Sequence, residues 1–125
     1  MDSISNIAGL IARVILGAFW IYFGYTKIGG IEGLQGYMGK FGVPAFLAWP
    51  VVALELIGGI MILLGFFSRY AALALAVFTV VTTLIFHSEL GDRTQFLFFA
   101  KNFALVAGLL LLVANGPGRQ AINQK

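Results

Sequence analysis

Long apolar runs dominate the pattern of hydrophobic and polar positions along the chain. A helix needs roughly 20 apolar residues to cross the hydrocarbon core of a bilayer, which is about 30 Å thick. Leu, Ile, Val, Phe and Ala fill these runs without the two-residue alternation of a barrel strand, which favours helices over strands. The pattern therefore predicts four membrane-spanning helices, at residues 7–26, 45–67, 70–87 and 95–114.

The connections between the runs carry most of the charged residues. Ser68 and Arg69 alone separate the second and third runs, so we expect these two spans to form an antiparallel hairpin. Asn115, Gly116 and Pro117 follow the fourth run and are typical helix stop signals. An even number of spans places both termini on the same side of the membrane.

Residues 30–43 form a different kind of segment. Ile31, Leu34 and Met38 recur at roughly helical spacing. Glycine nevertheless occupies every third position from Gly30 to Gly42, and each glycine costs about 1 kcal/mol within a helix. We therefore predict a short interfacial or re-entrant element after the first helix, which forms only when it docks.

Composition supports a membrane protein. The 125-residue chain is 60% hydrophobic and 10% charged, whereas an ordinary soluble domain carries about 25% charged residues. Such a chain could not cover a water-exposed surface with polar groups, and disorder requires low hydrophobicity with high charge. The sequence therefore predicts an all-α membrane fold, a four-transmembrane-helix bundle, with residues 1–125 forming a single membrane domain.

Charge and cysteine content exclude several function classes. The formal net charge is +3, but the basic residues are scattered singly rather than in a stripe that could follow a nucleic acid. The absence of cysteine removes thiol chemistry and iron–sulfur ligation by this chain. A single histidine and no cysteine also argue against a metal site. The chain itself encodes no cofactor, so a redox role would need a bound cofactor or a partner protein.

Charged residues inside the predicted spans are the first candidate functional residues. Small and polar residues line up on one face of each run, and such faces pack against one another in membranes. Arg13 lies roughly 10 Å deep and Glu55 about 16 Å deep from the side of the termini, so we predict an ion pair between them. In the alternative, Arg13 snorkels to the interface and Glu55 is protonated.

A ligand site with a surplus positive charge is the second prediction. His87 ends the third run, and Lys101 lies about 9 Å below the same surface, next to Asn102. Arg13 and Lys101 against Glu55 leave one surplus positive charge within the bundle. This charge suits an anionic ligand or one with carbonyl oxygens, such as a quinone, an oxyanion or a lipid phosphate. In the alternative, His87 is interfacial and Lys101 snorkels.

Residues near the ends of the first span are predicted to be interfacial. Lys27 marks the membrane boundary and lies close enough to the His87 side to help bind an anion. Trp20, Tyr22 and Tyr25 are expected to form an aromatic belt. The candidate ligand-binding residues are therefore Arg13, Lys27, Glu55, His87, Lys101 and Asn102, and Glu55 is the candidate for proton exchange.

Several motifs in combination resemble the DoxX family. They are Arg13, the G-x-x-K of Gly24 and Lys27, the E-x-x-G-G of Glu55 to Gly59, the G-x-x-x-R of Gly65 to Arg69, His87, and the pair Lys101 and Asn102. The match runs in the family's order over nearly the whole chain. It implies a multi-pass protein of the bacterial inner membrane with four helices and cytoplasmic termini, an orientation that the balanced basic residues do not decide. Relatives in this superfamily include a small subunit of a thiosulfate:quinone oxidoreductase, and others are tied to membrane redox and thiol-stress assemblies.

The functional hypothesis is a quinone-interacting or accessory subunit of a membrane redox complex. In this hypothesis Lys101, His87 and Asn102 contact a quinone oxygen, while Glu55 exchanges protons and Arg13 holds it ionised. The alternative is a non-enzymatic membrane scaffold or assembly factor, in which the same residues only lock helix packing. A small-molecule transporter is a third hypothesis and needs an oligomer. The expected partners are membrane lipids, a redox partner protein and further copies of this chain, and no nucleic acid.

Overall fold

The protein is all-helical over residues 2–125, which the computed structural model describes. Helix α1 spans Asp2–Gly29, α2 Ile31–Lys40, α3 Ala48–Leu64, α4 Ser68–Phe86 and α5 Arg93–Asn115, and a short 3-10 helix, η1 (Ala45–Leu47), precedes α3. Four segments are long and apolar enough to cross a membrane, namely Ser3–Gly29, Ala45–Leu64, Ser68–Phe86 and Arg93–Asn115. The described residues contain no strand, and the predicted all-α fold with four spans is confirmed.

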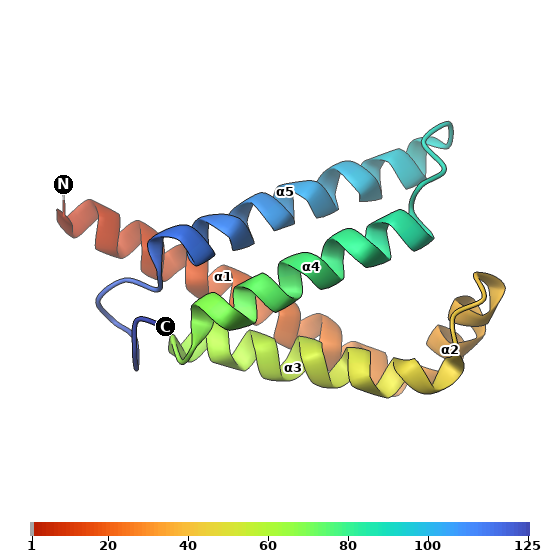
Figure 1. Ribbon diagram of the computed structural model, residues 1–125, viewed down its shortest axis with the longest axis horizontal. Coiled ribbons are helices and arrows are strands. Elements are labelled where there is room, and N and C mark those ends of the chain that lie inside the picture. Colours follow the sequence, from red (N-terminus) through yellow and green to blue (C-terminus); the bar gives the residue numbers. More distant parts are fainter. Residues whose placement is uncertain (1) are drawn as a thin grey trace.

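The four long helices form two pairs, α1 with α3 and α4 with α5, which are joined where α3 packs on α4. The two pairs lie close together near the C-terminus and diverge towards α2 (Figure 1). We call the end with the α3–α4 turn (65–67) and the C-terminus the closed end. The end with α2 and the α4–α5 loop (87–92) is the open end.

Glycines let α1 and α3 approach backbone to backbone. A Cβ added to Gly17 would lie 2.9 Å from the carbonyl oxygen of Gly59, and one added to Gly59 would lie 3.0 Å from the carbonyl oxygen of Gly17. Further along α1, a Cβ on Gly24 would lie 3.2 Å from the Cβ of Glu55. Helices in lipid associate through such small residues, and the predicted small-residue faces of α1 and α3 are the ones that meet.

The hydrophobic core lies where the two helix pairs meet. Ile62 of α3, Leu75 of α4 and Leu109 of α5 are fully buried there, together with Trp20 of α1. Side chains on the outer faces, such as Ile57, are exposed. The apolar exterior fits a bundle whose surroundings are lipid rather than water.

The connection between α3 and α4 differs from the prediction. The chain turns at residues 65–67 rather than at Ser68 and Arg69, because Gly65 adopts a left-handed conformation (φ 70°) that ends α3. Phe67 is also left-handed (φ 47°), and α4 begins directly after it. The first and fourth helices extend beyond the predicted spans, because hydropathy detects only the apolar part of a helix.

The glycine-rich segment forms an ordinary helix, α2, which lies across the open end (Figure 1). Met38 on α2 is buried. Tyr37 and Phe41 reach Phe86 at the end of α4, with ring centroids 5.3 and 4.9 Å apart, respectively. The short element predicted after the first helix is therefore present, and its aromatic side chains bridge the two helix pairs.

The C-terminal segment after α5 folds back over the α3–α4 turn. The backbone N–H groups of Ile122 and Asn123 donate to the carbonyl oxygens of Leu64 (3.3 Å) and Gly65 (3.1 Å). The Asn123 side chain accepts a hydrogen bond from the Phe67 N–H at 2.9 Å. Carbonyl groups at a helix C-terminus have no partner within the helix, so this tail completes the end of α3 and closes that side of the bundle.

Candidate functional site: a cationic cavity at the open end

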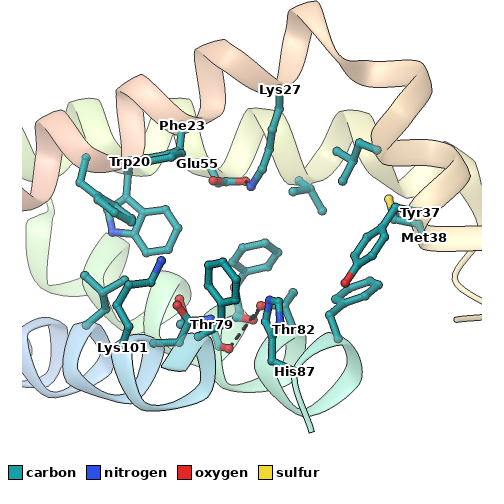
Figure 2. A pocket seen from close by; sticks show the side chains of 18 residues that line it. Trp20, Phe23, Lys27, Tyr37, Met38, Glu55, Thr79, Thr82, His87 and Lys101 are labelled. Atoms are coloured by element: carbon teal, nitrogen blue, oxygen red, sulfur yellow. Dashed lines mark hydrogen bonds and ion pairs between the residues drawn. The ribbon is translucent and has the colours of Figure 1, made fainter. Parts of the chain in front are cut away.

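A cavity of about 350 Å³ lies between the two helix pairs at the open end (Figure 2). Aromatic rings from four helices form much of its wall, namely Phe19, Trp20, Phe23, Tyr37, Phe78, Phe86 and Phe98. The polar side chains on the wall are Lys27, Glu55, Thr79, Thr82, His87, Lys101 and Asn102. The cavity therefore brings together all the predicted ligand-binding residues except Arg13, and its volume lies at the lower end of the range for small-molecule sites.

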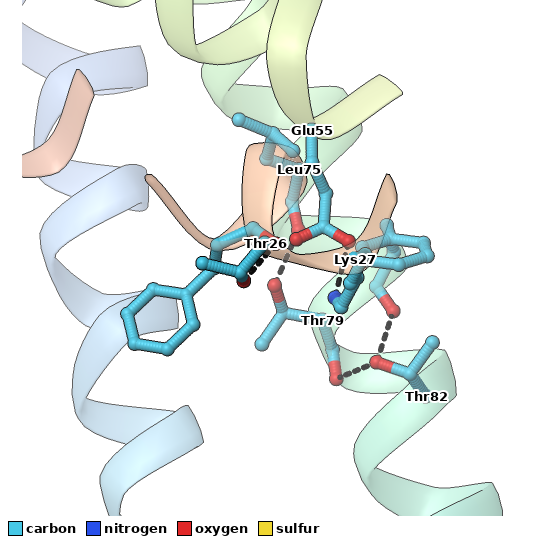
Figure 3. Close-up of polar contacts among 8 residues, drawn as sticks. Thr26, Lys27, Glu55, Leu75, Thr79 and Thr82 are labelled. Carbon is cyan, nitrogen blue, oxygen red and sulfur yellow. Dashed lines mark hydrogen bonds and ion pairs between the residues drawn. The ribbon is translucent and has the colours of Figure 1, made fainter. Parts of the chain in front are cut away.

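Glu55 forms an ion pair with Lys27. The Lys27 ammonium donates a hydrogen bond to Glu55 Oε1, and Figure 3 shows the pair beside Thr79 of α4. The Glu55 side chain is 1% exposed and that of Lys27 is 33% exposed. The carboxylate is thus enclosed by α1, α3 and α4, while the ammonium group remains partly accessible.

The predicted ion pair between Arg13 and Glu55 is wrong, and helix register explains why. Glu55 packs beside Gly24, which places it one turn from Lys27 and about three turns, roughly 16 Å, from Arg13. The sequence placed Lys27 at the membrane boundary, beyond the first span. Because α1 continues to Gly29, Lys27 instead lies inside the helix, one turn after Gly24, and is the basic group nearest to Glu55 along α1.

Arg13 belongs to the closed end. Its side chain is 3% exposed, and it donates to the carbonyl oxygens of Pro117 (3.2 Å) and Gln120 (2.5 Å) in the C-terminal tail. A buried charge is costly unless polar groups surround it, and these two carbonyls supply part of that surrounding. In this geometry Arg13 fastens the tail to α1 and does not line the open-end cavity.

Hydroxyl and amide groups of α4 and α5 also line the cavity. Thr79 and Thr82 donate to the backbone carbonyls of Leu75 (2.7 Å) and Phe78 (2.9 Å) one turn earlier. Each hydroxyl proton is thereby occupied, and the oxygen keeps its capacity as an acceptor. Asn102 donates to Thr83 at 3.0 Å and so ties α5 to α4 beside the cavity.

His87 and Lys101 flank the ring of Phe98. The imidazole stacks on this ring with centroids 5.1 Å apart, and its Nδ1 lies 2.8 Å from Gln95 Oε1. The Lys101 ammonium lies 4.9 Å from the centroid of the same ring, a cation–π contact. Among residues 3–125, whose side chains the structure describes, Lys27 and Glu55 form the one salt bridge, so no carboxylate there lies within ion-pair distance of Lys101.

The charges on the cavity wall do not balance. Lys27 and Lys101 carry one positive charge each and Glu55 one negative charge, with His87 neutral, so one positive charge is in excess. The sequence predicted a surplus of the same sign and size, but with Arg13 in the place that Lys27 occupies. An unpaired charge inside a membrane protein is a default candidate for a functional site.

Most residues of the wall were not predicted as site residues, and Trp20 and Tyr37 are two of them. Trp20 was placed in an interfacial belt, but it is 5% exposed and lines the cavity. Its position seven residues after Arg13 on the polar face of α1 was the available signal. Tyr37 reaches the cavity only because α2 folds across the open end, which no spacing in the sequence indicates.

The fold and the site together define a small four-span helical membrane protein with a cationic, aromatic-lined cavity. Residues 8–88 match the sequence model of the DoxX family, and the chain belongs to this family. It is 39% identical over 124 residues to the Escherichia coli (strain K12) "Inner membrane protein YqjF", an alignment that covers 99% of this chain and 95% of the relative. It is also 32% identical to the E. coli "Inner membrane protein YphA", with 93% and 88% of the two chains covered.

A third relative bears a functional name. The chain is 34% identical over 76 residues to the Bacillus subtilis (strain 168) protein named "Putative oxidoreductase CatD", an alignment that covers 61% of this chain and 57% of that protein. No solved structure gives a significant match to the chain. In the part of the chain that the structure describes, no group of three or more His, Cys, Asp or Glu side chains is arranged to hold a metal ion.

Proposed function

We propose that this protein is a quinone-interacting or accessory subunit of a membrane redox complex, located in the bacterial inner membrane with cytoplasmic termini. The observation that carries the proposal is the cavity itself, in which Lys101, His87 and Asn102 face the Lys27–Glu55 pair across an aromatic-lined space. A quinone ring is flat and apolar and carries two acceptor oxygens. Aromatic walls with a few convergent polar groups are typical of sites for such ligands.

Each polar group has a chemical role in this proposal. Lys101 is a donor to a quinone oxygen, and its surplus charge favours the electron-rich reduced ring. Because the oxygen of Gln95 accepts, Nδ1 of His87 donates in this contact, and Nε2 of the neutral ring can accept a hydrogen bond from a hydroxyl group of a reduced quinone. The oxygens of Thr79 and Thr82 can accept hydrogen bonds from the hydroxyl groups of a reduced ring. Glu55, held by Lys27, is the carboxylate within the cavity wall that can take up or release a proton.

In this proposal the electrons come from another protein. The sequence contains no cysteine and therefore no thiol or iron–sulfur ligand of its own. The similarity to a protein named as an oxidoreductase covers a part of this chain and supports a redox setting. In the proposed complex, this chain binds and orients the quinone and moves protons, while a redox partner protein supplies or accepts electrons.

The first test is thermal stability of the purified protein with a panel of quinones, because a ligand that binds only the folded state raises the melting temperature. We expect a saturable rise that Lys101→Met abolishes. Lys40→Met is the matched control, since Lys40 is exposed on α2 and does not line the cavity. The absence of a rise with every quinone would favour the alternative, a membrane scaffold or assembly factor.

The scaffold alternative rests on a specific observation. Arg13, a buried charge of the first span, is engaged by carbonyl groups of the same chain, which is the behaviour of a residue that locks packing. The same test separates the two proposals. If the protein is a scaffold, quinones should raise the melting temperature of neither the unaltered protein nor Lys101→Met. A partner protein should instead be recovered with the bundle after crosslinking.

A further inference from the structure

We infer that the ligand of the open-end cavity carries a long apolar tail, and that this tail lies in a groove between α1 and α5. This inference rests on the proposed function and names the ligand class more closely: a lipid-soluble quinone with a single apolar chain, rather than a small water-soluble one. Three observations carry it, namely a second cavity, its position about one helix turn from the first, and unfilled space beside glycine.

A second cavity, of about 400 Å³, lies between α1 and α5 nearer the closed end. Small and aliphatic residues form most of its wall, including Gly9, Ala12 and Leu16 of α1 and Gly108, Leu111 and Leu112 of α5. This wall suits a hydrocarbon chain and offers little to a charged head group. Arg13 also borders it, but its guanidinium is already bonded to the C-terminal tail.

The two cavities follow one face of each helix. On α5, the open-end cavity ends at Leu105 and the second cavity begins at Gly108, one turn later. On α1, the second cavity ends at Leu16 and the open-end cavity begins at Phe19. Residues three or four apart share a helix face, so both cavities belong to one seam. From Lys101 to Leu112 this seam is about 16 Å long, and it leads away from the polar groups.

The glycines of this seam differ from those between α1 and α3. A Cβ on Gly17 or Gly59 would meet backbone atoms of the partner helix at about 3 Å, whereas a Cβ on Gly9 or Gly108 would meet nothing within 4 Å. Small residues at Gly9 and Gly108 therefore do not serve a helix contact within this chain. They leave the seam hollow.

A hydrocarbon tail is the occupant that fits this hollow best. A helix from a second copy is about 10 Å across with its side chains, which is too wide for a groove of this volume that runs past several turns. A tail attached to a ring in the open-end cavity would emerge at Leu105 and Phe19, where the groove begins. The polar head and the apolar tail would then each lie against a wall of matching character.

The test compares quinones that share one ring but differ in the tail, with the full chain in lipid nanodiscs and affinities expressed per bilayer mole fraction. We expect the quinone with a prenyl or decyl tail to bind more tightly than the ring alone. Gly108→Leu should lower the affinity for the tailed quinone about tenfold, the effect of an overpacked contact. It should leave the affinity for the tail-free ring unchanged. Ala107→Leu is the matched control, because Ala107 is exposed and lines neither cavity.

The outcomes distinguish this inference from the proposed function. Equal affinities for tailed and tail-free rings, with no effect of Gly108→Leu, overturn the groove assignment and leave the ring site standing. An equal loss for both ligands in Gly108→Leu also overturns it, because the substitution then acts on the ring site. If neither quinone binds the unaltered chain, both the groove and the proposed function fail.

A second measurement needs no variant. A quinone with a photoreactive group at the end of its tail should label the α5 peptide around Gly108 and Leu111 and the α1 peptide around Ala12. Labelling on the outward residues Ile57 of α3 and Val77 of α4, which are 58% and 56% exposed, without labelling in the groove would overturn the inference. So would a photoreactive phospholipid that labels the groove and is not displaced by the tailed quinone, because the groove would then belong to bulk lipid.

Discussion

The closed and open ends of the bundle treat the same kind of residue in opposite ways. Arg13 and Lys27 are both basic residues of α1, about four turns or 21 Å apart, and both lie within a candidate membrane span. Arg13 is bonded to backbone carbonyls of the tail, and little of it is accessible. Lys27 is bonded to a carboxylate on the wall of a cavity and is a third exposed.

The difference shows what separates a structural intramembrane charge from a candidate functional one. An arginine that donates to backbone carbonyls of a folded tail holds that tail in place, so its role is structural. A carboxylate on a cavity wall can exchange protons or release its lysine to a ligand. The partner of the charge, more than its depth in the membrane, indicates its role.

Arg13→Ala should produce the largest change and would sharpen the structural side of the comparison. We expect a loss of about 3–5 kcal/mol in the free energy of unfolding, because two hydrogen bonds from a charged donor are worth roughly 1.5–3 kcal/mol each. Denaturant titration of the detergent-solubilised protein measures this loss. Removal of residues 117–125 should cost more, because it also removes the hydrogen bonds of the tail to Leu64, Gly65 and Phe67. Adding Arg13→Ala to this truncation should cost little further, because its two carbonyl partners are already gone.

One result would contradict the structural role of Arg13. If Arg13→Ala kept its stability but no longer responded to quinone, Arg13 would be a ligand-binding residue, and the contrast between the two ends would be lost.

Breaking the Lys27–Glu55 pair should have the next largest effect, and the two partners should differ. Lys27→Met leaves a carboxylate with 1% exposure and no cationic partner, and we expect it to cost about 2–3 kcal/mol, somewhat below the range for a fully buried pair because Lys27 is partly exposed. Glu55→Gln should cost about 1 kcal/mol, because the freed lysine can extend towards the membrane surface.

Unfolding of the two single variants and of the double variant measures the difference. The double variant should be more stable than Lys27→Met alone, since it removes the unpaired carboxylate. A larger loss for Glu55→Gln than for Lys27→Met would mean that the lysine, rather than the carboxylate, is the enclosed partner.

Glycine substitutions at the α1–α3 contact and in the groove between α1 and α5 should change the stability less than loss of the ion pair. Gly59→Ala should destabilise the bundle by about 1–3 kcal/mol, because its Cβ would lie 3.0 Å from the Gly17 carbonyl oxygen and would overpack the α1–α3 contact. Gly108→Ala should stabilise it by up to about 1 kcal/mol, because the Cβ meets open space and alanine favours the helix. Thermal unfolding in detergent measures both. A destabilising Gly108→Ala would show that α1 and α5 pack more tightly than the groove allows.

The sequence predicted the fold and most of the cavity for the same reason. Apolar runs report membrane spans directly, and polar residues within such runs are costly enough to collect inside the bundle. Glu55, His87, Lys101 and Asn102 were placed together on this argument, and the structure brings them to one cavity.

The errors come from backbone geometry that side-chain patterns do not encode. Arg13 binds main-chain carbonyl groups of the C-terminal tail, and hydrogen bonds to the α3–α4 turn hold this tail in place. The pairing of Lys27 with Glu55 was missed because α1 continues to Gly29, beyond the end of its apolar run. Trp20 was assigned to the interface because depth along a helix does not tell which neighbour covers a side chain.

Lys101→Met should have the smallest effect on stability and is the most direct test of the open end. Its ammonium contacts the face of Phe98, a contact worth about 0.5–1 kcal/mol at an exposed site, and methionine keeps the length and the apolar stem of the side chain. We therefore expect less than about 1 kcal/mol of change in the unfolding free energy, measured beside Arg13→Ala under the same conditions. A lysine that only locked packing would show a loss closer to that of Arg13, and the surplus charge of the cavity would then be structural. If Lys101→Met leaves the free energy of unfolding nearly unchanged, the charge of Lys101 does not stabilise the fold. This result is expected of an intramembrane charge whose role is to bind a ligand.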